Sequence, residues 1–108
     1  MTDDELKALL DRAQKTEAHA SVLAERAKQI AKWGDMHDND HDGGELATAA
    51  AMLADPESEF DAPEKYQEDE WMYRLGAKHR HDRRKMLVIA TALLLAEIER
   101  LDRAEARR

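Results

Sequence analysis

The stretch from Met86 to Ala96 constrains the fold of this chain more than any other part of the sequence. Its 11 residues carry no charge, and at helical spacing their apolar side chains cover every side of a helix. A helix of this kind must be buried on all sides, and it is far shorter than the roughly 20 residues that span a membrane. Two other helices of one small chain cannot enclose it. We therefore expect a homo-oligomer, a dimer or a tetramer, and no membrane partner.

The composition favours helices throughout. Aromatic residues make up only 5% of the 108 residues, charged residues make up 38%, and Ala and Leu dominate the apolar 43%. We predict one all-α domain over residues 1–108. Its helical bundle has a long N-terminal helix to about Trp33, a short Ala-rich helix over 45–54 and a long buried C-terminal helix over 83–103.

Local signals set the ends of these helices. Thr2 and Glu5 have the spacing of a capping box, Gly34 can end the first helix, and Asp82 can cap the last one. The low helix propensity around residues 19–21 allows a bend or a break into two helices there. Residues 55–70 hold both prolines and many acids, so we expect an acidic excursion from the bundle.

Charge is distributed unevenly along the chain. Residues 35–70 carry thirteen acids and one base, whereas residues 71–108 carry ten bases and five acids, within a net charge of -7. The acidic middle would repel a nucleic-acid backbone, so nucleic acid is not the expected partner. The acidic start of the sequence does not have the form of a signal peptide, and the chain has no cysteine, which together favour a cytoplasmic protein.

The densest group of metal-ligand side chains lies between residues 37 and 45. It includes Asp38, His41 and Glu45, and carboxylates gathered in this way suit a hard cation such as Mg²⁺ or Mn²⁺. The spacing of Asp38, Asp40 and Asp42 also matches half of a calcium-binding EF-hand loop, but Ala49 stands where that loop needs a glutamate. The third interpretation is a solvated acidic loop.

Three further acids lie on the predicted C-terminal helix. Glu97 directly follows the uncharged run, so we expect it to be partly buried and to need a metal, an arginine or a hydrogen-bond donor. Glu99 and Asp102 are three residues apart, a spacing at which two carboxylates can hold one cation. The alternative for them is surface pairing with Arg100 and Arg103.

A basic stretch at the start of the same helix suits phosphate groups. It includes Lys78, Arg83 and Arg84, and both guanidinium groups and the N–H groups of a helix start bind phosphate oxygens. Trp33 or Trp71 could stack on a nucleotide base. The alternative is attraction between this stretch and the acidic excursion.

Several segments together resemble a group of small phage and prophage proteins, some of which are described as similar to MazG-like all-α nucleotide pyrophosphohydrolases. The segments that carry the resemblance are Glu25-Arg26, Gln29-Ile30, Trp33-Gly34, His37-Asp38, His41, Gly44 to Ala50, Arg83-Arg84 and Ala92 to Leu101. That class carries Glu-x-x-Glu on one helix and Glu-x-x-Asp on the next. Glu99 and Asp102 match the second motif. Glu45 is followed by Thr48, so Asp38 or His41 would have to complete the first.

The resemblance implies a dimeric or tetrameric helical bundle that uses Mg²⁺ to cleave a nucleoside triphosphate into a monophosphate and pyrophosphate, in the cytoplasm of an infected or lysogenic bacterium. In that scheme Asp38, His41, Glu45, Glu97, Glu99 and Asp102 are candidate metal ligands. Glu45 and Glu97 would be catalytic, whereas Lys78, Arg83, Arg84 and Trp33 would bind the nucleotide. The alternative function is a phage protein that binds or sequesters a host nucleotide signal, or docks on a host protein, without turnover.

Overall fold

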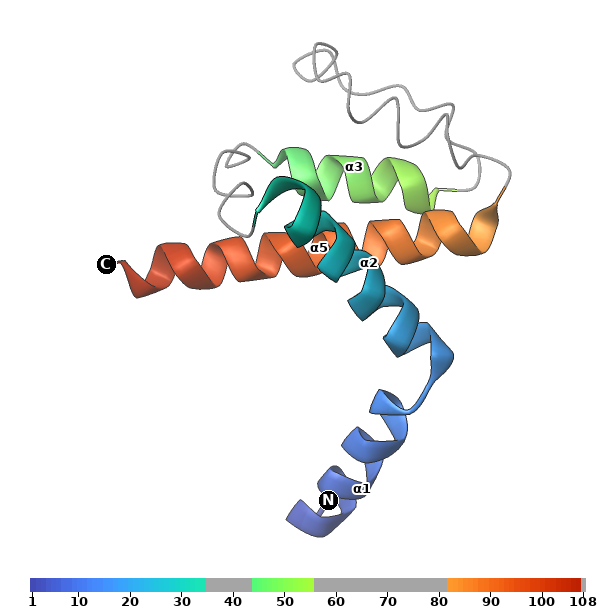
Figure 1. Ribbon diagram of the computed structural model, residues 1–108. Helices are drawn as coiled ribbons and strands as arrows, with labels where there is room; N and C mark the ends of the chain where they lie inside the picture. Colours follow the sequence, from blue (N-terminus) through green and yellow to red (C-terminus); the bar gives the residue numbers. More distant parts are fainter. Residues whose placement is uncertain (35–43, 56–81, 108) are drawn as a thin grey trace.

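The chain folds into helices wherever the structure describes it. The computed structural model describes residues 1–34, 44–55 and 82–107, and no strand occurs among them. Four helices make up nearly all of these residues: α1 (Asp3–Gln14), α2 (Glu17–Trp33), α3 (Glu45–Ala54) and α5 (Arg83–Ala106) (Figure 1). The predicted all-α class is confirmed. Apart from Asp55, the predicted acidic excursion lies outside the described residues.

The N-terminal segment forms two helices that meet at Lys15 and Thr16. The predicted capping box is present, because the Thr2 hydroxyl accepts from the Glu5 backbone N–H at 3.1 Å and the Glu5 carboxylate accepts from the Thr2 backbone. Thr16 then caps α2 by accepting from the backbone N–H of His19 at 3.1 Å. Of the two predicted possibilities, a bend or a break into two helices, the structure shows the break. It lies a few residues before the expected position, because Thr16 supplies a cap there.

The later helix ends agree closely with the sequence signals. α2 ends at Gly34, whose φ of +82° is unfavourable for any residue with a Cβ atom. α3 has the predicted bounds. The side chain of Asp82 accepts from the backbone N–H of Lys85 at 3.0 Å and caps α5, which continues three residues beyond the predicted Arg103.

The core lies between α3 and α5. Alanines on α3 let the two helices approach closely, so that Ala49, Ala50, Ala90 and Ala96 are almost fully buried together with the large side chains of Leu53, Ile89 and Leu93. α2 packs on another side of α5, and α1 has no buried residue. No helix in the described part of the chain is both long and apolar enough to cross a membrane.

One side of α5 is covered neither by α2 nor by α3. The uncharged run is buried at Met86, Val88, Ile89, Ala90, Ala92, Leu93 and Ala96, but Leu87 and Leu94 remain 39% and 46% exposed. Farther along, Ile98 and Leu101 are 56% and 52% exposed. The two neighbouring helices therefore bury only part of a helix that is apolar all round.

We predict that Leu53→Ala lowers the free energy of unfolding by about 2–5 kcal/mol, because the side chain is 1% exposed and its loss leaves a cavity between α3 and α5. Leu10→Ala on α1 is the matched control, since Leu10 is 52% exposed, and it should change stability by no more than about 0.5 kcal/mol. Urea unfolding followed by circular dichroism measures both. Equal losses in the two variants would contradict this location of the core.

Candidate functional site

The structure describes seven of the ten residues predicted to form a site. Asp38, His41 and Lys78 lie outside the described residues. The seven that can be placed come from three helices: Trp33, Glu45, Arg83, Arg84, Glu97, Glu99 and Asp102. Their surroundings decide which of them could act together.

Glu97 is shielded from water and paired with an arginine. Its side chain is 13% exposed, and its Oε1 accepts from Nε of Arg100 at 2.6 Å. The two residues are three apart on α5, so their side chains lie next to each other on the same face of the helix. The expectation that Glu97 is partly buried and needs a partner is confirmed, and in this chain the partner is Arg100.

Glu99 is held by a buried arginine from α2. Nε of Arg26 donates to Oε1 of Glu99 at 2.7 Å, and Arg26 is only 4% exposed, whereas the Glu99 side chain is 36% exposed. A guanidinium in such a place needs a carboxylate to offset its desolvation. This ion pair was not predicted from the sequence. The sequence signal for the burial of Arg26 is its helical spacing with Val22 and Gln29, which share the inward face of α2.

The start of α5 is also tied to α2. The guanidinium of Arg84 donates to the hydroxyl of Ser21 at 3.0 Å, and Nζ of Lys85 pairs with Glu25 at 3.1 Å. The neighbouring residues Glu25 and Arg26 thus reach toward opposite ends of α5. These polar and charged contacts help to fix the position of α2 across α5.

The basic and acidic candidates of α5 lie far apart within one chain. α5 is continuous from Arg83 to Ala106, and at about 1.5 Å per residue Arg84 and Glu97 are separated by about 20 Å along the helix axis. The two groups therefore do not form a single site on one copy of the helix. Within the described ranges, no three acidic or histidine side chains gather closely enough to hold a metal ion.

Trp33 and Glu45 have local structural roles, whereas Asp102 has none that the structure describes. Nζ of Lys32 lies 5.1 Å from the centroid of the Trp33 ring, a cation–π contact at the end of α2. Glu45 is half-buried in the first turn of α3, where a carboxylate is favoured by the helix dipole. Asp102 is exposed on α5.

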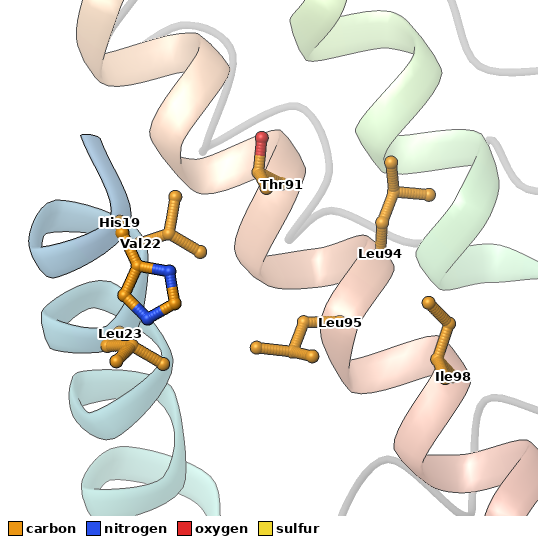
Figure 2. A pocket seen from close by; sticks show the side chains of 7 residues that line it. All are labelled: His19, Val22, Leu23, Thr91, Leu94, Leu95 and Ile98. Atoms are coloured by element: carbon orange, nitrogen blue, oxygen red, sulfur yellow. The ribbon is translucent and has the colours of Figure 1, made fainter. Parts of the chain in front are cut away.

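An apolar groove of about 290 Å³ runs between α2 and α5. Figure 2 shows Leu95 pointing toward α2, whereas Leu94 and Ile98 project away from it. The groove is lined by His19, Val22, Leu23, Thr91, Leu94, Leu95 and Ile98. Among the described residues that line it, His19 alone is ionisable, so the groove suits apolar side chains and not a polyphosphate.

We predict that Glu99→Gln destabilises the fold by about 1–3 kcal/mol, because it removes the charge that faces the buried guanidinium of Arg26. In the Arg26→Met background the same substitution should cost much less, since the buried charge is then gone. A double-mutant cycle by urea unfolding measures this coupling. Additive effects would show that the ion pair does not contribute to stability.

Comparison with known proteins gives no further guidance to the site. No family model matches the chain, and neither a curated protein nor a solved structure matches it.

Proposed function

We propose that the protein is a cytoplasmic nucleoside triphosphate pyrophosphohydrolase that depends on Mg²⁺ or Mn²⁺. The observation that carries this proposal is the position of Glu97 and Glu99. Both lie in the C-terminal half of α5, the half toward which α2 ends and α3 begins in Figure 1. Gly34 and Gly44, at these two helix ends, flank the segment that contains Asp38 and His41.

The chemistry of these side chains suits a hard divalent cation. Carboxylate oxygens are its preferred ligands, and Glu45 adds a carboxylate at the same end of the bundle. Arg100 now neutralises Glu97 and Arg26 now neutralises Glu99, and a bound cation would replace one of these arginines. The two carboxylates are two residues apart on α5 and face opposite sides of it, so each would belong to a different ligand set. When bound, it would supply charge neutralisation on the phosphates and an activated water.

The basic residues at the start of α5 would bind the phosphate groups. Arg83 and Arg84 are exposed in its first turn, where the helix dipole also favours an anion. In the proposed reaction they neutralise the leaving pyrophosphate, while Glu45 and Glu97 orient the attacking water.

We predict that the protein releases pyrophosphate from at least one member of a panel of NTPs and dNTPs in the presence of Mg²⁺ or Mn²⁺. Glu97→Gln should lower this turnover about 100-fold, because the variant loses a ligand charge. Asp11→Asn, on exposed α1, is the matched control and should retain full activity. Circular dichroism establishes that both variants are folded. No turnover by the unaltered protein on any substrate would refute the proposal.

A second candidate function is nucleotide binding without turnover. The ion pairs of Glu97 and Glu99 favour it, because both carboxylates are already neutralised within the fold and need no cation. Such a protein would hold a nucleotide through its exposed arginines and release it unchanged.

For this candidate we predict that a cyclic or modified nucleotide binds tightly and is recovered intact after the protein is denatured. Arg83→Ala should weaken binding about tenfold or more, since a guanidinium forms charge-assisted hydrogen bonds with phosphate. Lys15→Ala removes an exposed cation at the α1–α2 junction, away from the start of α5, and is the matched control. Calorimetric titration measures both affinities. Equal affinities for the two variants would exclude Arg83 from the binding site.

A further inference from the structure

The uncovered side of α5 carries a regular seam of residues. Leu87, Leu94 and Leu101 alternate with Thr91 and Ile98 at spacings of four, three, four and three. All five side chains are exposed, although α2 and α3 bury the other two sides of the same helix. Single exposed leucines are common on protein surfaces, but a repeat of this kind is the pattern by which two helices pack together.

The seam has opposite charges at its two ends. Continuing the same spacing adds Arg84 before Leu87 and Glu105 after Leu101. Arg83 and Asp102, both exposed, lie beside these ends and repeat the same signs. The bond from Arg84 to Ser21 on α2 holds the basic end at the edge of the uncovered side.

This pattern is complementary to itself when it is reversed. The midpoint between Arg84 and Glu105 falls between Leu94 and Leu95. A second copy of α5 running in the opposite direction therefore brings Leu87 near Leu101 and Leu94 near Leu94, and sets Thr91 against Ile98. It also sets each basic end against an acidic end. A parallel copy would place like charges together at both ends, which is unfavourable. Antiparallel helix dipoles add to the preference for the reversed arrangement.

We propose that α5 pairs with α5 of a second copy of this chain, antiparallel and about a two-fold axis near Leu94. In this dimer Arg84 lies toward the partner's Glu105, and the reverse contact is equivalent by symmetry. Leu23 of α2 is 50% exposed and shares the apolar groove with Leu94, so it widens the surface that the second copy covers.

Sedimentation equilibrium of the full chain tests the interface without any activity measurement. We expect the unaltered protein at the mass of two 12.3 kDa chains and Leu94→Asp at the mass of one. Leu10→Asp is the matched control, because Leu10 is equally exposed but lies on α1, and it should remain a dimer. If Leu94→Asp fails to fold by circular dichroism, Leu101→Lys replaces it. A monomeric unaltered protein, or a dimeric Leu94→Asp or Leu101→Lys variant, would overturn the proposal.

Because the chain has no cysteine, a single introduced cysteine can test whether a second copy of the chain covers this side of α5. Leu94→Cys should form a disulfide-linked dimer on mild oxidation, because the two copies of residue 94 meet near the axis. Leu10→Cys should link far less. Equal linkage of both variants would indicate random collision.

Charge reversal tests the direction of the pairing. Arg84→Glu should weaken the dimer about tenfold, because it sets two carboxylates against each other, and adding Glu105→Arg should restore it. A parallel pair would gain nothing from the second substitution. Failure of the rescue would overturn the antiparallel arrangement, whatever the outcome of the nucleotide assays.

Discussion

The burial of α5 determines the arrangement of the other helices. Its uncharged run presents apolar side chains in every direction, so each neighbouring helix must cover part of its surface. α3 does so by close approach through alanines, and α2 does so while holding α5 through the pairs of Arg26 with Glu99 and Glu25 with Lys85. Both solutions leave the Leu87–Leu101 side open. A row of exposed apolar side chains at this regular spacing favours a further partner.

The sequence was sufficient to predict the helices because their signals are local. The capping box of Thr2, the cap at Asp82 and the Ala-rich α3 each depend on residues a few positions apart. The pair of Arg26 with Glu99 joins residues 73 apart in the chain, and no local pattern specifies which acid meets a buried arginine. Thr16 was missed as a cap for a different reason, because several residues around it are compatible with a continuous helix.

The candidate site was harder to predict than the fold. The burial of Glu97 followed from its position directly after the uncharged run, and its partner Arg100 was among the alternatives that the sequence allowed. The separation of Arg84 from Glu97 depends on α5 continuing without interruption, since a break would have allowed the two to approach. The described helices thus supply the residues of a phosphate and cation site without assembling them on one copy.

An antiparallel pair of α5 helices would change that separation. Within one chain the basic start of α5 and its acidic end are about 20 Å apart, but a reversed second copy brings the start of one helix beside the end of the other. The exposed Arg83 then lies toward the end of the partner helix that carries the carboxylates. In that register Arg84 lies beside the partner's Glu105, whereas the partner's Glu97 is still about 12 Å away along the helix axis. The dimer would thus shorten the separation between the phosphate-binding arginines and Glu97 from about 20 Å to about 12 Å, and loss of the dimer would restore the longer distance.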